Sequence, residues 1–426
     1  MDATTGGKVT TFTPPATHLA ATRTPERLLK KYNALSKPLA VVSPEVLCLW
    51  RAGGLSRSAF RVIKVTMRET SLGYFYDSLS NKKSHSPFNG QIELTYRCGL
   101  NCLHCYCKGS ELTSPELTTK EWKKIFSKIR REGCIHLTFT GGDPLMRADF
   151  LDLYSDAKSK GFMVTIFTNG QTLNAKILSH LAKSPPDSIE ITLNGITKEV
   201  YESITQVKGS FFRVMGDIKK IKEKKLPLVL KSNCLKQNKG ELAKIKAFAD
   251  KFLGKKKGKY HFKYDPVVYP RLNGDRTPTN FRLSFQELLV LKRQDRDIWR
   301  QYQKGMEADF PDLGRDKNFL YRCTAWRGQF FINPYGRLKF CNFSDKFSVD
   351  LKTTAFSEGF YRVFPKLLNE KFKTHSKCID CQLRPVCYHC PARAYLETGN
   401  EEAAVEYYCQ LAQETKKQKE LFTNSK

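Results

Sequence analysis

The chain has 426 residues, of which 40% are hydrophobic, and its 72 Lys plus Arg against 42 Asp plus Glu give a formal net charge of +30. This length allows two or three domains, and the composition is ordinary for a soluble globular protein. No apolar run reaches the ~18 residues of a membrane span, and no apolar stretch after Met1 is typical of a signal peptide. We therefore expect a cytoplasmic protein that has no membrane as a partner.

A net charge of +30 is compatible with nucleic acid, an anionic membrane surface or an acidic peptide as a partner. The basic residues are spread along predicted helices, and no aromatic-rich binding motif accompanies them. The pattern therefore favours a generally basic surface, and it does not favour nucleic acid as a partner.

The N-terminal part of the chain contains no recognisable motif. Residues 1–24 are rich in Thr, Ala and Pro with little apolar patterning, so we expect a disordered tail. Within residues 25–90, Leu28, Tyr32 and Leu35 recur at near-helical spacing. Two interpretations of this segment remain open, because it could pack against the following domain or form a small peptide-binding module.

From Gln91 onward, short β-like runs alternate with helical patterns. The predicted strands are Gln91–Thr95, Ile135–Thr140, Phe162–Thr168, Ser188–Leu193, Leu228–Asn233 and Tyr260–Tyr264. A helix over Thr119–Arg131 is predicted to begin with a capping box of Thr118 and Glu121, and a second helix spans Ala148–Lys160. This alternation predicts an α/β fold, a partial (β/α)6 TIM-like barrel of parallel strands over residues 91–275, with ligands at the carboxyl ends of the strands.

Two further segments follow the predicted barrel. Residues 276–322 contain Leu283, Leu288 and Trp299 among polar residues, and we expect a helical connector. Residues 323–426 contain seven cysteines, which predicts a small C-terminal Cys-rich domain.

Three cysteines, Cys98, Cys102 and Cys105, are spaced CxxxCxxC just after the first predicted strand. A structural zinc site takes four ligands and an ordinary iron–sulfur cluster takes four cysteines, so three cysteines indicate a metal centre with one open position. The alternative is a zinc knuckle that is completed by His104 or Cys107.

The spacing of these cysteines, with His104 and Tyr106 beside the third, resembles the signature of radical S-adenosyl-L-methionine (SAM) enzymes. The resemblance implies that Cys98, Cys102 and Cys105 hold a 4Fe-4S cluster whose fourth iron chelates the amine and carboxylate of SAM. These three cysteines are then the catalytic residues, and SAM is a cofactor.

The ends of the next strands extend the resemblance to a SAM pocket. The run Gly141–Pro144 is similar to the Gly-Gly-Glu-Pro loop that meets the amino group of SAM in this family, with an acidic residue one methylene shorter. Residues at the ends of the third and fourth strands resemble family positions that line the cavity, where a hydroxyl or amide reaches the ribose. The implied SAM-binding residues are Gly141, Gly142, Asp143, Pro144, Asn169, Thr192 and Asn194, with Asn233 as a further pocket candidate.

The seven C-terminal cysteines are Cys323, Cys341, the run Cys378, Cys381, Cys387 and Cys390 with the spacing CxxCxxxxxCxxC, and Cys409. This pattern looks like the SPASM extension of radical SAM enzymes that modify peptides and proteins. The resemblance implies two auxiliary 4Fe-4S clusters, an outer one on Cys378, Cys381, Cys387 and Cys409 and an inner one on Cys323, Cys341 and Cys390. The alternative is a zinc ribbon built from the two CxxC pairs, which leaves Cys323, Cys341 and Cys409 unexplained. Four cysteines fall outside all these patterns and are predicted to be ordinary thiols, namely Cys48, Cys107, Cys134 and Cys234.

The resemblance implies that an electron from a reductant such as a flavodoxin or ferredoxin cleaves SAM to methionine and a 5′-deoxyadenosyl radical, which removes a hydrogen atom from the substrate. Gly336 and Cys341 form the pattern GxxxxC, and sulfatase-maturing relatives look to use an aspartate just after this cysteine as a base. Asn342 stands at that position and cannot accept a proton in that role. We therefore predict a maturase that crosslinks or dehydrogenates a ribosomally made peptide or protein. The alternatives are a dehydrogenase of a carbohydrate or cofactor precursor, or a zinc-dependent, basic nucleic-acid-binding protein.

Overall fold

The computed structural model describes residues 85–110, 114–254, 261–295, 299–300, 302–303, 317–323, 327–387 and 389–424. The chain divides into two compact units, Met1–Ser78 and Leu79–Lys426, and the described residues all belong to the second. The predicted tail over 1–24, most of the segment over 25–90 and Cys48 lie outside the described residues, so these interpretations stay predictions.

Six parallel strands form the first part of the sheet, in the order of the chain. They are β1 (Asn89–Thr95), β2 (His136–Gly141), β3 (Met163–Thr168), β4 (Ser188–Thr192), β5 (Leu228–Asn233) and β6 (Phe262–Asp265). Each strand falls within two residues of a predicted one, and the predicted partial α/β barrel is confirmed.

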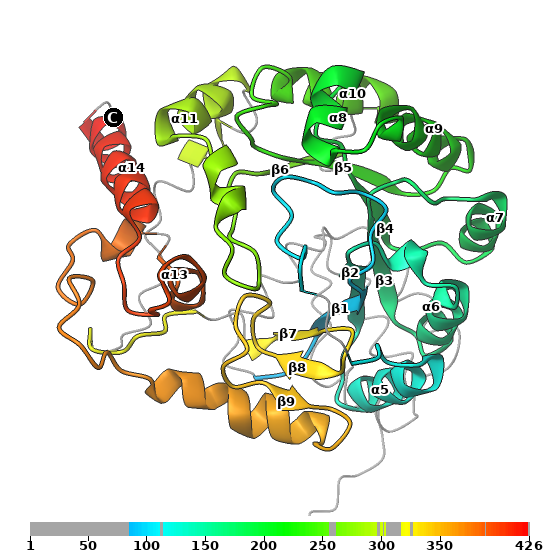
Figure 1. The fold of residues 1–426 in the computed structure, drawn as a ribbon, viewed down its shortest axis with the longest axis horizontal. Helices are drawn as coiled ribbons and strands as arrows, with labels where there is room; N and C mark the ends of the chain where they lie inside the picture. Colours follow the sequence, from blue (N-terminus) through cyan, green and yellow to red (C-terminus); the bar gives the residue numbers. More distant parts are fainter. Residues whose placement is uncertain are drawn as a thin grey trace, which may run out of the picture. The chain divides into compact units, whose positions relative to one another are not determined.

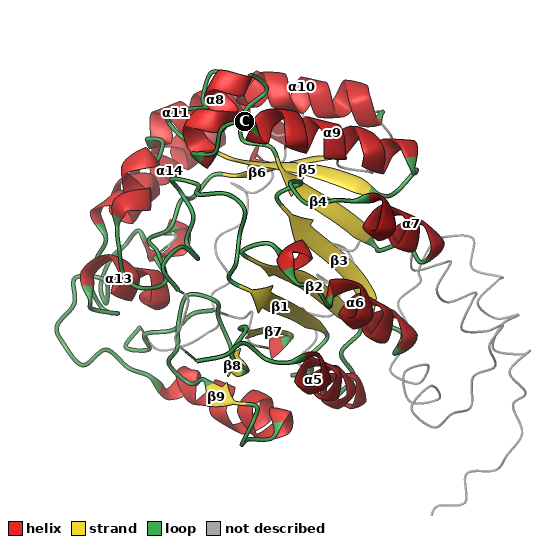
Figure 2. Cartoon of the chain, turned by 45° about the vertical axis from the view of Figure 1, so that its right-hand side comes forward, coloured by secondary structure: helices red, strands yellow, loops and turns green. Residues whose placement is uncertain are grey.

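Helices lie on the outer side of the curved sheet (Figures 1 and 2). They are α5 (Thr119–Arg131), α6 (Phe150–Ser159), α7 (Ala175–Lys183), α8 (Lys198–Thr205), α9 (Ser210–Glu223) and α10 (Leu242–Leu253). The first helix has the predicted bounds and the predicted capping box of Thr118 and Glu121. The second begins two residues later than predicted, because Asp149 stays outside it and bonds Arg147.

The two faces of the sheet differ in chemistry, as strand β2 illustrates. Phe139 faces the helices and packs against Phe126 of α5 and Phe150 of α6, with ring centroids 5.7 and 6.4 Å away. His136, three residues earlier, faces the interior, where it contacts Asn89 of β1 at 2.9 Å and Thr165 of β3 at 3.0 Å. The apolar core therefore lies under the helices, while the barrel interior carries polar groups.

The C-terminal region adds three strands that the sequence does not predict, β7 (Gln329–Ile332), β8 (Arg337–Lys339) and β9 (Val349–Asp350). Strand β7 runs parallel to β1, and the complete sheet has the order β6-β5-β4-β3-β2-β1-β7-β8-β9. Gly90 makes this pairing possible, because a Cβ atom there would lie 2.5 Å from the Phe330 ring. One sheet thus crosses the predicted domain boundary at residue 323.

The remaining elements are short helices and turns. The short helix η1 (Pro144–Met146) follows β2. The described part of the predicted connector contains η2 (Thr277–Phe281) and α11 (Phe285–Gln294). After β9 come η4 (Glu358–Val363), η5 (Phe364–Asn369), η6 (Arg384–Val386), α13 (Pro391–Thr398) and α14 (Glu406–Asn424). Among the helices of the described ranges, none combines the length and apolar character that crossing a membrane requires.

Candidate functional site

The loop with Cys98, Cys102 and Cys105 leaves the carboxyl end of β1, as predicted. Its backbone is fastened to the end of α8, because the Asn101 and Leu103 amides each donate to a carbonyl there, at 3.0 Å. Burial raises the pKa of the Cys102 thiol, and the charges of Cys105 and Cys98 raise it further. The charges of the three thiols act on one another, and in number and chemistry these thiols match three of the four donors that an iron–sulfur cluster takes.

Of the candidate fourth zinc ligands, Cys107 is buried and His104 is half-buried. The Asn194 amide nitrogen is 3.3 Å from Nε2 of His104, and burial lowers the pKa of this histidine to about 4. A hydrogen bond from Cys107 lowers the pKa of the Cys105 thiol to about 7. In the described ranges, no three or more His, Cys, Asp or Glu side chains, these thiols included, are grouped closely enough to hold a single metal ion.

The Gly141–Pro144 loop packs directly against the segment that leads to Cys98. The Gly142 and Asp143 amides donate to the carbonyls of Thr95 and Arg97 at 2.8 and 2.9 Å. A Cβ atom would lie 2.1 Å from the Thr95 oxygen at Gly141 and 2.4 Å from the Arg97 oxygen at Gly142. Both positions therefore require glycine, because main chain fills the space that a side chain would take. Pro144 is buried at the start of η1.

The Asp143 carboxylate is fully buried and points toward the end of β3. It accepts hydrogen bonds from the Leu145 amide at 2.9 Å, the Thr168 hydroxyl at 2.8 Å and the Asn169 amide at 3.0 Å. Burial raises its pKa to about 6, against the lowering effect of these bonds. The Asn169 side chain in turn donates to the Cys98 sulfur at 3.3 Å.

Thr192 and Asn194 lie at the end of β4, as expected for pocket residues. The Asn194 side chain is buried, and its oxygen accepts the Asn233 amide at 2.9 Å. Thr192 is half-buried and pairs in register with Lys231 of β5. Asn194 therefore links the ends of β4 and β5 to His104 in the cysteine loop.

A charged cluster inside the barrel was not predicted. Glu190 on β4 binds Lys263 on β6 at 2.6 Å and lies 3.5 Å from the Lys231 nitrogen. The Lys231 ammonium sits 3.2 Å from the centroid of the Phe167 ring, and burial lowers its pKa to about 8. The signal was present in the sequence, since Glu190 stands between two isoleucines in β4 and Lys231 directly follows Leu-Val-Leu in β5.

The seven C-terminal cysteines fall into two groups by the charges that act on them. Burial raises the pKa of Cys341 to about 12, and the charges of Cys390 and Cys323 also raise it. Burial likewise raises the pKa of Cys387 to about 11, and the further contributions come from Cys409, Cys378 and Cys381. The two groups have the same members as the ligand sets that the SPASM resemblance implies, and the clusters themselves stay a prediction. Of the cysteines outside the sets, Cys107, Cys134 and Cys234 are buried as predicted.

A buried polar cluster lies between the first and the inner cysteine groups. Glu93 of β1 is fully buried, accepts a hydrogen bond from the Tyr96 hydroxyl at 2.9 Å and faces the amide of Asn342. Lys339 donates to the Asn342 carbonyl at 2.9 Å. Burial raises the pKa of Glu93, and the Lys339 charge opposes that effect. These contacts connect the residues before Cys98 with those flanking Cys341.

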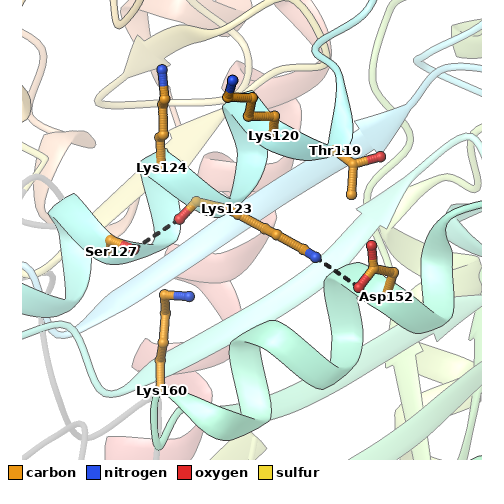
Figure 3. Close-up of a pocket in the computed structure, with 7 residues that line it drawn as sticks. All are labelled: Thr119, Lys120, Lys123, Lys124, Ser127, Asp152 and Lys160. Atoms are coloured by element: carbon orange, nitrogen blue, oxygen red, sulfur yellow. Dashed lines mark hydrogen bonds and ion pairs between the residues drawn. The ribbon is translucent and has the colours of Figure 1, made fainter.

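A cavity of about 530 Å³ lies on the outside of the barrel, between α5 and α6 (Figure 3). Lys123 crosses it to form an ion pair with Asp152 at 2.7 Å, whereas Lys120 and Lys124 project away from that pair. The cavity has no cysteine in its lining, which also includes Thr119, Ser127 and Lys160. It is thus a basic surface feature separate from the cysteine groups.

Two curated proteins are similar to this chain. AdoMet-dependent heme synthase of Methanosarcina barkeri is 26% identical over 329 residues, which cover 72% of this chain and 92% of that protein. PqqA peptide cyclase of Rhizobium meliloti is 28% identical over 241 residues, covering 54% of this chain and 64% of that protein.

Among solved structures, Streptococcus suis SuiB bound to its precursor peptide SuiA is similar in fold, with a TM-score of 0.60 at 17% identity. The likeness covers 86% of this chain and 87% of SuiB. The model of the radical SAM superfamily matches residues 92–249, which include the three cysteines after β1 and the strand ends described above. This chain is an enzyme that contains a domain of the radical SAM superfamily.

Proposed function

We propose that this enzyme oxidatively modifies a ribosomally made peptide or protein, forming a crosslink or a dehydrogenated residue by radical chemistry. The observation that supports the proposal is the presence of one cysteine trio after the first strand and seven further C-terminal cysteines, in a chain similar to PqqA peptide cyclase. A radical SAM domain alone needs only the trio. The C-terminal cysteines support a reaction in which an electron also leaves the substrate.

Cys98, Cys102 and Cys105 would hold the 4Fe-4S cluster, which, when bound with SAM, supplies the carbon radical that removes a hydrogen atom. The chain's own contribution is to position and enclose SAM. The main chain at Gly141 and Gly142 would face its amino group, with Asp143 and Pro144 holding that loop in place. The polar side chains of Asn169, Thr192 and Asn194 would line the remainder of the pocket.

The C-terminal cysteines would hold two auxiliary clusters in the sets described above. The inner set includes Cys341, whose neighbour Asn342 meets the buried Glu93. An amide at that position cannot take a proton from the substrate, which argues against sulfatase maturation and supports a different oxidative modification.

Two relatives support a peptide as the substrate. PqqA peptide cyclase is named for a peptide, and SuiB was solved bound to the precursor peptide SuiA. The chain spans 64% of the cyclase and 87% of SuiB. A peptide-binding role for residues 25–90 would suit this function.

A cofactor precursor is the second candidate substrate. It is favoured by the similarity to AdoMet-dependent heme synthase, which extends over 92% of that protein. The two candidates differ in whether a peptide changes mass in the presence of the enzyme.

The test is anaerobic co-expression with short peptides encoded beside the gene, followed by mass spectrometry. We expect one peptide to lose two hydrogens, about 2 Da, with the wild-type enzyme and with Cys234→Ala, which removes a buried thiol outside the cysteine groups. The Cys98→Ala variant should leave every peptide unchanged. An unchanged peptide set with wild-type enzyme would move the proposal to the cofactor precursor.

Metal analysis of the same anaerobic preparation tests the clusters themselves. Three clusters correspond to roughly 10 or more irons per chain, with matching sulfide. Zinc without sulfide would instead support the zinc knuckle and zinc ribbon.

A further inference from the structure

A continuous chain of hydrogen bonds joins the ends of β1, β2 and β3 and finishes on a sulfur atom. Asp143, after β2, is attached to the segment before Cys98 through its amide, which donates to the Arg97 carbonyl. Its carboxylate crosses to Thr168 and Asn169 at the end of β3. The Asn169 side chain then returns to Cys98.

The Asp143 carboxylate is fixed on both oxygens. Oδ1 accepts the Leu145 amide at 2.9 Å, and Oδ2 accepts the Thr168 hydroxyl at 2.8 Å and the Asn169 amide at 3.0 Å. The side chain is fully buried, so water does not compete for these bonds. The carboxylate therefore holds the Asn169 backbone in one position relative to the cysteine loop.

The orientation of the Asn169 amide is also determined. Its Oδ1 accepts a hydrogen bond from the Gln171 amide at 3.0 Å, and a backbone N–H can only donate. The opposite end, which lies 3.3 Å from the Cys98 sulfur, must then be the NH2 group. The contact is thus an N–H···S hydrogen bond to one of the three thiols.

We propose that Asn169 is a positioning residue that raises the reduction potential of the cluster on Cys98, Cys102 and Cys105 by donating a hydrogen bond to the Cys98 sulfur. The proposal rests on the function proposed above. An N–H donor stabilises a thiolate more strongly as the cluster becomes more negative, so it favours the reduced state. Asp143 contributes by holding Asn169 in place.

The test is a potentiometric titration of the anaerobically reconstituted enzyme, monitored by the EPR signal that Cys98→Ala abolishes. Asn169→Leu removes the donor at similar volume, and Asn169→Asp keeps the shape and the acceptor for Gln171. We expect both variants to have a more negative reduction potential than wild type. The expected shift is about 59 mV, which changes the ratio of oxidised to reduced cluster about tenfold for a one-electron couple.

Asn273→Leu is the matched control, because the Asn273 side chain accepts the Asp275 amide at 3.1 Å in the same kind of turn. This variant should titrate like wild type. An unshifted potential in Asn169→Leu at full iron content would overturn the proposal, as would loss of the cluster from both Asn169 variants. Absence of any Cys98-dependent signal from wild-type enzyme would instead count against the proposed function.

Discussion

At the scale of single residues, the ion pair of Arg282 and Glu397 has the least exposed side chains among the ion pairs of the described residues. Two Arg282 nitrogens bind the Glu397 carboxylate at 2.7 and 2.9 Å, and the Arg282 Nε donates to the Val268 carbonyl at 2.7 Å. The side chains of the pair are only 7% and 9% exposed. Because Glu397 belongs to α13, the pair fastens the Cys-rich region to the segment after β6.

Glu397→Ala should destabilise the protein by about 3–5 kcal/mol, because it leaves a buried guanidinium without its partner. Urea unfolding of the holoenzyme measures the change. The control is Glu358→Ala, which breaks an exposed pair with Arg362 at 3.5 Å and should cost less than about 1 kcal/mol. Equal losses in the two variants would show that burial does not set the strength of the Arg282 pair.

Single residues also show which features of the site could be predicted from the sequence and which could not. Cys98, Cys102 and Cys105 could be predicted as cluster ligands because the CxxxCxxC spacing lies within eight consecutive residues. The contact between Asn169 and Cys98 could not be predicted, because 71 residues separate the two and the contact depends on how β1 and β3 are aligned. The direction of the Asp143 side chain likewise follows from tertiary structure.

At the scale of elements, a hydrogen-bonded chain crosses four strands inside the barrel. His136 of β2 contacts Asn89 of β1 and Thr165 of β3, and Thr165 lies 3.3 Å from the Ser188 hydroxyl on β4. Burial lowers the pKa of His136 to about 4, and the Lys263 charge adds to that effect. The imidazole is therefore neutral at neutral pH.

This histidine predicts a specific loss of stability in acid. The unfolded chain binds a proton with a pKa near 6.5, whereas the folded protein excludes it down to pH 4. The stability that the neutral imidazole contributes is therefore fully present above about pH 6.5 and is lost by the time the pH has fallen to about 4. The free energy of unfolding changes by about 3 kcal/mol over this range.

The measurement compares unfolding free energies at pH 7 and pH 4 in wild type and His136→Gln. The wild type should lose about 3 kcal/mol more than the variant over this range. Substitution of the exposed His375 by Gln should leave the wild-type pH dependence intact. Parallel pH curves for wild type and His136→Gln would contradict the prediction.

The elements also differ in how far their sequences reveal them. Strands β1 to β6 are apolar runs separated by amphipathic helices, so local periodicity was sufficient. Strands β7, β8 and β9 have only four, three and two residues, too few for a periodic signal. Strand β7 pairs with β1, a non-local interaction, and β8 and β9 follow from β7 by antiparallel pairing.

At the scale of the whole molecule, the net charge of +30 would attract an acidic electron carrier, and a flavodoxin or ferredoxin is the predicted reductant. The lysines that rim the cavity between α5 and α6 are part of this basic surface. Attraction of this kind acts over about a Debye length and weakens as salt is added.

Reduction of the enzyme by an acidic flavodoxin should therefore slow by about tenfold between low and high salt. If the carrier docks near the cavity, reversing the charges of Lys120 and Lys124 to Glu should reduce the rate at low salt by a similar factor. Stopped-flow absorbance measures the rate. The control reverses two exposed lysines elsewhere, Lys198 and Lys224, and an equal effect of both pairs would show that only total charge matters.

The pairing of β7 with β1 has a consequence for synthesis of the chain. Ile92 and Ile332 are neighbours in the sheet although 240 residues (332 minus 92) separate them. At about 5–20 residues per second, the ribosome needs about 12–48 s to make the second after the first. During this interval one edge of β1 has no partner, and unpaired strand edges promote aggregation. Nascent chains of this enzyme should therefore depend on chaperones until β7 has been translated.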